Sequence, residues 1–363
     1  MASRKTLRVR PSARGFLLGL HRYVGLFAAA FLVIAGLTGS ILAFAEDYDR
    51  WMHPSLWRVT PEGARLSEQT LVDRIRGRLA SDGSAVRIEE IRMAGDQSSQ
   101  LFALTDGRMM FVNPYTGAVL GTTDHPSKVA VFVGWVHQLH VRLLAGDWGE
   151  RLVEIATTGV FFLVPTGVYL WWEKKRLTLK WAASWRRINW DLHNVAGLYG
   201  SVLIFLLAAT GLLVAFETPL YWMARSEPWH PEAAPHSVPP EAGGSDRSAP
   251  ALDALILAAG RALPDSETYQ IQLPMRPRSS LQLLQRKPWV PGHSTVYFDR
   301  YDGRILRVDD LSKLPRAYRA HFLNQAIHMG TILGLPSKIL LSLSSLLLVV
   351  LVVTGCLMWW QRA

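Results

Sequence analysis

The chain has 363 residues, of which 49% are hydrophobic and only 19% are charged, and its formal net charge is +10. Such a composition indicates a membrane protein. The positive charge could suggest a nucleic-acid-binding protein, but the basic residues flank apolar segments, so no nucleic-acid partner is expected.

Four apolar windows are long enough to cross a lipid bilayer. A hydrocarbon core of about 30 Å requires about 20 residues of α-helix, because each residue adds about 1.5 Å. The windows are nearly free of charge and cover residues 15–45, 152–172, 195–216 and 339–360. They predict four transmembrane helices.

The basic residues predict the orientation of these helices. They are Arg4, Lys5, Arg8, Arg10 and Arg14 before the first window, and Lys174, Lys175, Arg176, Lys180, Arg186 and Arg187 between the second and third windows. Since positive charge stays on the cytoplasmic side, both termini and the short loop are predicted to be cytoplasmic. The long connections, residues 46–150 and 217–337, are then periplasmic, which corresponds to a multi-pass protein of a bacterial inner membrane.

The first window also has some features of a signal peptide. Residues 43–45, Ala-Phe-Ala, resemble a signal-peptidase site. However, the apolar run before them is about twice the usual length of about 7–15 residues, which predicts an uncleaved anchor. The single cysteine, Cys356, lies in the fourth window and has no partner for an intramolecular disulfide.

Both long connections carry the same strand, turn and strand pattern. Residues 112–120, Val-Asn-Pro-Tyr-Thr-Gly-Ala-Val-Leu, parallel residues 298–306, Phe-Asp-Arg-Tyr-Asp-Gly-Arg-Ile-Leu. Each copy places a glycine where a tight hairpin requires positive φ. Upstream lie stretches with helical spacing of apolar residues, 67–79 and 251–262, so a small α+β module is predicted twice.

The segment between the third window and the second module differs from the rest. Residues 227–250 contain six prolines and the pair Gly243-Gly244, without apolar periodicity. This composition predicts a flexible linker.

The predicted fold is a membrane protein with four transmembrane α-helices, an internal duplication and two small α+β modules on the periplasmic side. In chain order the parts are 1–45 (basic tail and first transmembrane helix), 46–126 (first module), 127–172 (interfacial helix and second transmembrane helix), 173–190 (cytoplasmic loop), 191–217 (third transmembrane helix), 218–316 (linker and second module) and 317–363 (interfacial helix and fourth transmembrane helix). Because both halves begin and end inside, the duplication implies a pseudo-two-fold axis along the membrane normal.

The duplication carries one histidine at the start of each odd-numbered window. His21 is repeated as His193, in the context Leu-His-x-x-x-Gly-Leu. The shift in numbering between them also carries Thr38-Gly39 onto Thr210-Gly211. Two helices related by a two-fold axis could present these imidazoles to opposite faces of one haem. The alternative is a pair of interfacial histidines hydrogen-bonded to neighbouring carbonyl groups.

A second pair precedes the even-numbered windows. His140 is repeated as His328, in segments typical of amphipathic helices, 129–144 and 317–333. The shift between these two histidines also maps Thr166-Gly167 onto Thr354-Gly355, with no gap. This pair could ligate a second haem near the outer surface.

Two other interpretations of the outer pair remain open. His137 lies one turn before His140 and is an alternative outer ligand, and with His321 these residues could instead form a histidine-rich zinc site. His137 maps onto Gln325, however, so only His140 and His328 follow the symmetry.

Several cofactor motifs are absent from the sequence. It contains no G-x-G-x-x-G turn, no Walker loop and no C-x-x-C pair. The chain therefore has no evident nicotinamide, flavin, nucleotide or iron–sulfur site, and any electrons must come from another donor.

The order of these motifs resembles the PepSY-associated transmembrane family over nearly the whole chain. The resemblance is carried by the two Leu-His segments at His21 and His193, by His140 and His328, and by the two Tyr-x-Gly hairpins. Similar members are ferric-siderophore reductases of the inner membrane. The resemblance implies two b-type haems per chain and release of iron from a ferric siderophore in the periplasm. The sequence His137-Gln-Leu-His140 departs from the family pattern because it offers two histidines.

We therefore expect an oxidoreductase, a dihaem cytochrome that passes electrons from a cytoplasmic flavoprotein reductase or a quinol to a periplasmic ferric chelate. The alternative is a haem-free, membrane-anchored protein whose modules bind a peptide, a protease or a siderophore. A transporter is a third hypothesis, but no window is broken by Pro-Gly near its centre.

Overall fold

A computed structural model of the protein describes residues 13–81, 83, 85–123, 127–172, 178–216, 222–223, 225, 232–240 and 250–361. Most of the basic residues that predict the topology, in segments 1–12 and 173–177, lie outside the described residues, as do parts of the predicted linker. The chain divides into two compact units. We call them the helix unit (Met1–Ala45, Gly134–Glu217 and Asn324–Ala363) and the sheet unit (Glu46–Val133 and Thr218–Leu323).

The helix unit contains four long apolar helices, which confirm the four predicted windows. They are α1 (Ala13–Leu42), α6 (Gly146–Trp172), α7 (Trp185–Ala215) and α11 (Leu335–Trp360), and each is long and apolar enough to cross a membrane. Helices α6 and α7 begin well before their apolar windows, so His193 lies inside α7. The protein is a membrane protein.

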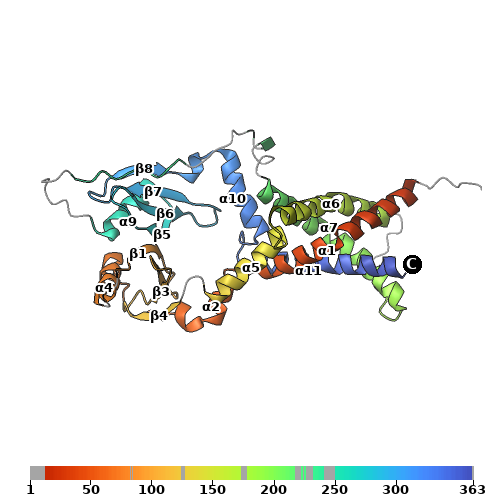
Figure 1. Ribbon diagram of the computed structural model, residues 1–363, viewed down its shortest axis with the longest axis horizontal. Coiled ribbons are helices and arrows are strands. Elements are labelled where there is room, and N and C mark those ends of the chain that lie inside the picture. The colour runs from red at the N-terminus through yellow and green to blue at the C-terminus, as the bar shows by residue number, and fades with distance from the viewer. Residues whose placement is uncertain are drawn as a thin grey trace, which may run out of the picture. The chain divides into compact units, whose positions relative to one another are not determined.

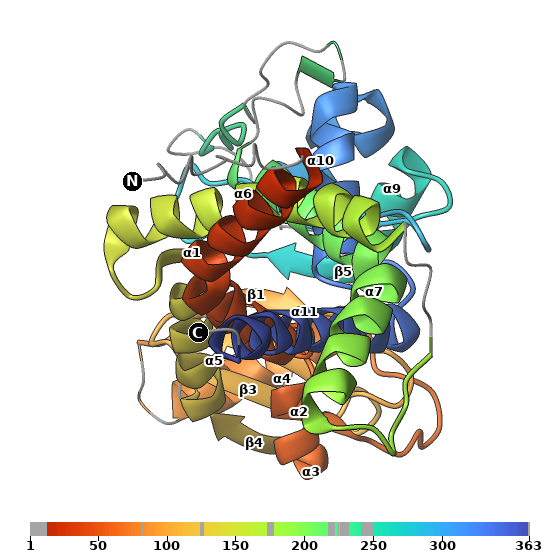
Figure 2. The same cartoon turned by 90° about the vertical axis from the view of Figure 1, so that its right-hand side faces the viewer.

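The four helices pack as a ring in which each contacts two neighbours. Helix α1 packs against α6 and α11, and α7 packs against the same two helices (Figure 2). The core between them consists of small and branched residues, namely Ala28, Leu32, Ala156, Val160, Ile204 and Ala208. Exchanging α1 with α7 and α6 with α11 reproduces this set of contacts, as the internal duplication predicts.

A shorter helix precedes each even-numbered window: α5 (Lys128–Arg142) before α6, and α10 (Arg316–His328) before α11. Between α5 and α6 the chain turns through Leu143 and Leu144, whose φ angles are 50° and 56°. Helix α10 ends at His328, earlier than the predicted segment, because Gly330 adopts a φ of 69° that an α-helix cannot continue.

The sheet unit is built on one antiparallel sheet in the order β4-β3-β2-β1-β5-β6-β7-β8 (Figure 1). The strands are β1 (Ile88–Arg92), β2 (Gln100–Leu104), β3 (Met109–Val112), β4 (Val119–Thr123), β5 (Glu267–Gln272), β6 (Leu281–Arg286), β7 (Ser294–Phe298) and β8 (Ile305–Asp309). Helices α4 (Glu68–Ser81) and α9 (Leu252–Ala262) pack on it, and short segments α2 (Tyr48–Met52), α3 (Pro54–Trp57) and η1 (Leu311–Lys313) flank it.

The two predicted α+β modules share this sheet instead of forming separate sheets. Strands β1 and β5 pair through Ile91 and Ile271, which are both fully buried. An open sheet edge exposes unpaired backbone groups, and pairing the two first strands covers one such edge in each module. The helices of the two modules, α4 and α9, are also joined. The Asp253 carboxylate on α9 accepts hydrogen bonds from the backbone N–H groups of Glu68 and Gln69 at the start of α4.

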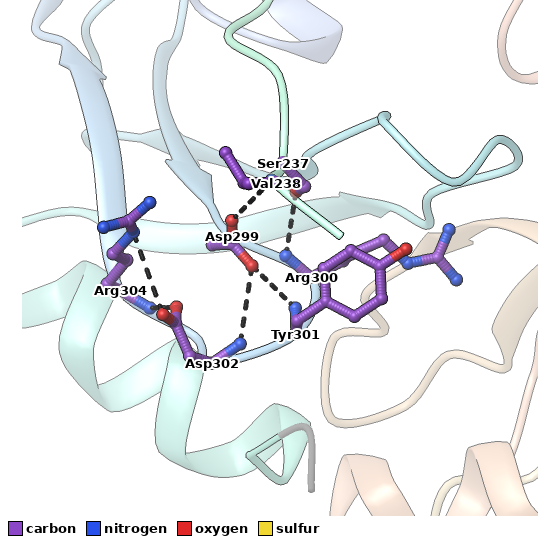
Figure 3. A network of polar contacts seen from close by, with 7 residues as sticks. All are labelled: Ser237, Val238, Asp299, Arg300, Tyr301, Asp302 and Arg304. Carbon is purple, nitrogen blue, oxygen red and sulfur yellow. Dashed lines mark hydrogen bonds and ion pairs between the residues drawn. The ribbon is translucent and has the colours of Figure 1, made fainter. Parts of the chain in front are cut away.

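The second hairpin shows that the predicted linker is wrong in its described part, residues 232–240. Asp299 Oδ1 accepts a bond from Tyr301 N–H at 2.8 Å inside the turn, while Oδ2 accepts from Val238 N–H at 3.2 Å (Figure 3). Ser237 Oγ in turn accepts from Arg300 N–H at 3.0 Å. Proline-rich composition predicted a free segment, but these hydrogen bonds fix it along the hairpin.

Candidate metal-ligating histidine pairs

The four predicted histidines all lie in the helix unit, and each is hydrogen-bonded to a threonine of a neighbouring helix. At one end of the bundle, His21 Nδ1 on α1 lies 2.8 Å from Thr166 Oγ1 on α6. The equivalent contact in the second half joins His193 Nδ1 on α7 to Thr354 Oγ1 on α11 at 2.9 Å. The partners follow the sequence repeat, so one geometry is built twice.

The second pair repeats this arrangement at the other end of the bundle. His140 Nδ1 on α5 lies 2.8 Å from Thr38 Oγ1 on α1, and His328 Nδ1 on α10 lies 3.1 Å from Thr210 Oγ1 on α7. On α1, Thr38 follows His21 by 17 positions (38 − 21), which is about 25 Å along an α-helix. The two histidine pairs therefore lie near opposite ends of the bundle.

The threonine hydroxyls favour one tautomer of each imidazole. Each threonine hydroxyl lies within hydrogen-bond distance of the backbone carbonyl four residues earlier, at 2.6 Å for Thr38 and Thr166, 2.8 Å for Thr210 and 2.7 Å for Thr354. Since a hydroxyl has a single proton, the bond to the carbonyl leaves Oγ1 only as an acceptor toward the imidazole. A proton on Nδ1 would satisfy this contact, and that tautomer would leave the lone pair of Nε2 available to a metal.

A glycine follows each threonine and allows the imidazole to approach the helix closely. A Cβ atom added to Gly39, Gly167 or Gly355 would lie 3.3, 3.3 or 3.4 Å from Cε1 of the adjacent histidine. At Gly211 the distance to His328 Cε1 would be 2.9 Å, which is too short for a carbon contact. The repeated Thr-Gly pairs were visible in the sequence, but their role depends on which helices are neighbours.

Two buried asparagines support the threonines of the second half, and sequence analysis did not identify them. Asn189 Nδ2 donates to the Thr354 carbonyl, and Asn324 Nδ2 donates to the Thr210 carbonyl, both at 3.0 Å. At the shifts that relate the histidines, the equivalent positions of the first half hold Leu17 and Val136. Because apolar residues occupy the first half, the repeat alone did not mark these positions.

Burial and neighbouring imidazoles also affect the outer pair. Burial, together with the nearby imidazoles of His328 and His137, lowers the pKa of His140 from 6.5 to about 4. All four histidines of the symmetric pairs are half-buried.

The other interpretations of the outer pair receive less support. His137 is exposed and has no threonine partner among its described contacts, whereas His140 is held by Thr38. His321 belongs to the sheet unit and packs on Phe322. Within the described residues, no three His, Cys, Asp or Glu side chains gather as metal ligands, so a zinc site has no third protein ligand there.

The remaining histidines have other surroundings. His53 lies 3.3 Å from the Asp49 carboxylate, His293 packs edge-on against Phe322, and His236 forms a backbone bridge with Ser279. His125 and His230 lie outside the described residues.

The chain matches a family model described as a PepSY-associated TM region over residues 18–362. No curated protein matches the chain. The match includes all four histidines of the symmetric pairs and both copies of the α+β module. The chain therefore belongs to the PepSY-associated transmembrane family.

Proposed function

We propose that the protein is a dihaem cytochrome of a bacterial inner membrane and acts as a ferric-siderophore reductase. Electrons would pass from a cytoplasmic flavoprotein or a quinol to a periplasmic ferric chelate, and the Fe(II) formed would be released from its chelator. The observation that carries the proposal is the fourfold arrangement in which Nδ1 of each histidine lies within hydrogen-bond distance of a threonine hydroxyl on a neighbouring helix.

The four histidines are residues that could hold two haem b groups. His21 and His193 would hold one group, and His140 and His328 the other, each through Nε2. Haem iron supplies reversible one-electron transfer when bound. A bis-histidine haem site needs no third protein ligand.

The chain contributes orientation and a low-polarity environment. The Thr166 and Thr354 hydroxyls fix the imidazole planes of one pair, and the bond from imidazole to hydroxyl strengthens the basicity of Nε2. The core around Leu32, Val160 and Ile204 excludes water from the centre of the bundle. Such surroundings tune the reduction potential of a bound metal centre.

The orientation in the membrane follows from the basic residues of the sequence. Under this proposal both termini and the loop after α6 are cytoplasmic, and the sheet unit is periplasmic. His21 and His193 then belong to the cytoplasmic end, and His140 and His328 to the periplasmic end. Electrons would thus reach the side on which the ferric chelate is bound.

A haem-free anchored receptor explains the sheet unit but leaves four equivalent His–Thr–Gly arrangements without a role. At a single histidine, such geometry would be ordinary packing. A receptor function does not explain why the same imidazole geometry recurs at both ends of a membrane bundle. We therefore place the reductase first.

The function is tested by single-turnover oxidation. Purified protein reduced with dithionite is mixed with a ferric siderophore, and Fe(II) is captured by a coloured Fe(II)-specific chelator. We expect reoxidation of the protein and Fe(II) in equal electron equivalents, and loss of both with His140→Ala or His328→Ala. His236→Ala, which changes an exposed histidine of the sheet unit, serves as the control. Reduced protein that stays reduced in the presence of ferric siderophores would contradict the proposal.

A further inference from the structure

The sheet unit contains a cavity of about 710 Å³. It lies where the segment after α3 meets the turn between β1 and β2, and it is lined by Arg50, Trp51, Trp57, Arg58, Gln97 and Ser98. Pockets for small ligands usually measure about 300–1,000 Å³. The volume is therefore that of a small-molecule site.

The wall of this cavity is a fixed structure. Backbone hydrogen bonds join Ser99 N–H to the Trp57 carbonyl at 3.0 Å and Val59 N–H to the Gln97 carbonyl at 3.2 Å. The Trp57 indole N–H donates to Asp49 Oδ2 at 2.9 Å, and its ring packs edge-on against the buried Phe111. The indole is thus held in place before any ligand binds.

The charge of the lining is positive. The Arg50 guanidinium stacks over the Trp57 ring at 5.0 Å, and Arg58 is exposed without a carboxylate partner among the described contacts. The nearby Asp49 carboxylate is bonded to Trp57 and faces His53, and it does not line the cavity. Two guanidinium groups without acidic partners favour an anionic ligand.

The aromatic lining restricts the ligand further. Trp51 has 55% of its surface exposed, and with Trp57 it offers two indoles to one cavity. Indole faces stack on flat aromatic rings, and guanidinium groups stack on the same kind of ring. A ligand that is both anionic and aromatic would complement the arginines and the tryptophans of the lining.

We propose that this cavity binds an anionic aromatic metal chelate of the tris-catecholate class. The inference rests on the proposed function, for which it names the class of ferric substrate and its binding residues. Arg50 and Arg58 would neutralise the catecholate charge, while Trp51 and Trp57 would contact the catechol rings.

Binding can be measured separately from reduction with a redox-inert metal. Full-length protein is titrated by calorimetry with gallium(III) tris-catecholate and, in parallel, with neutral gallium(III) tris-acetohydroxamate. We expect the catecholate to bind at least tenfold more tightly than the hydroxamate. Arg50→Gln and Arg58→Gln should each weaken catecholate binding about tenfold, as expected for loss of a charged contact.

Matched variants test the assignment to this cavity. Arg87→Gln removes the same charge from an exposed position of the same unit outside the cavity and should leave binding unchanged. Arg50→Lys keeps the charge but loses the planar group, so its effect should be intermediate. Equal affinity of Arg50→Gln, Arg58→Gln and Arg87→Gln would overturn the assignment.

An anionic lipid headgroup is the other source of the same chemistry. The titration is therefore repeated in nanodiscs of phosphatidylcholine with and without phosphatidylglycerol. Unchanged catecholate affinity supports the chelate, and competition by phosphatidylglycerol that disappears in Arg58→Gln would show a lipid site and overturn the proposal. Binding of gallium catecholate does not depend on haem content. A protein that binds gallium catecholate but lacks haem would therefore refute the proposed reductase and still support the proposed ligand of the cavity.

Discussion

The two halves of the helix unit build the same contacts from sequences that differ widely around them. In each half one histidine contacts the Thr-Gly pair of the following long helix, and the other contacts the Thr-Gly pair of the preceding one. Only the second half adds Asn189 and Asn324 behind its threonines. The imidazole, the hydroxyl and the glycine are thus the part that both halves share, and the asparagines are an addition to one copy.

The strongest test of the symmetry uses combinations of histidine variants. If the histidines act as pairs, the double variant His21→Ala/His193→Ala should lose one of two haems, as either single variant does. The double variant His21→Ala/His328→Ala should lose both, because it breaks each pair once. Haem per chain, measured as the pyridine haemochrome, distinguishes these results. Equal haem loss in the two double variants would contradict the assignment of the pairs.

The threonine hydroxyls are expected to have the next largest effect. Thr166→Val and Thr354→Val keep the side-chain shape but remove the acceptor for Nδ1–H, and such outer contacts typically contribute about 10–100-fold to metal-site affinity. We expect weaker haem retention and an altered reduction potential at the pair formed by His21 and His193, measured by spectroelectrochemistry.

Thr166→Ser is the matched control, since it retains the hydroxyl and should behave close to the wild type. The two halves should respond alike to the valine variants. An unchanged potential in both Thr→Val variants would show that the hydroxyls do not hold the imidazoles.

The glycines should distinguish the halves at the outer pair. A Cβ at Gly211 meets His328 at 2.9 Å, whereas a Cβ at Gly39 meets His140 at 3.3 Å. Gly211→Ala should therefore disturb its histidine more than Gly39→Ala, within the range of about 1–3 kcal/mol for overpacking. The two alanine variants are compared by the haem content and potential of the outer pair. A larger effect at Gly39 would indicate that the two outer contacts are not equivalent.

The asparagines should have the smallest effect. Asn189→Leu and Asn324→Val give the second half the residues of the first, and each removes one hydrogen bond worth about 1 kcal/mol. We expect a small decrease in the thermal unfolding midpoint and unchanged haem content. Loss of haem in either variant would show that the second half depends on a contact that the first half lacks.

Much of this arrangement could be predicted from the sequence. The lengths of the apolar windows predicted the four helices. The constant offsets in residue number between the two halves paired His21 with His193 and His140 with His328. Glycines at the turns of the hairpins, Gly117 and Gly303, have φ angles of 72° and 71°, as predicted. These features depend on local pattern or on repetition, both of which are visible in one chain.

Other features depend on contacts between distant segments and were not predictable. The pairing of β1 with β5 places Ile91 opposite Ile271, which lies in the other half of the chain, and no local pattern encodes it. The choice of Thr38 for His140 and of Thr166 for His21 required the order of helices in the ring. The proline-rich composition of residues 232–240 predicted a flexible linker, whereas hydrogen bonds to Asp299 and Arg300 hold this segment against the second hairpin.

The most direct measurement is the spectrum and the haem stoichiometry of the purified, full-length protein. A dihaem cytochrome should show a Soret band, two haems per chain, and low-spin ferric signals of bis-imidazole ligation by electron paramagnetic resonance. A protein without a Soret band, or with signals unchanged by His21→Ala and His140→Ala, would contradict the dihaem assignment.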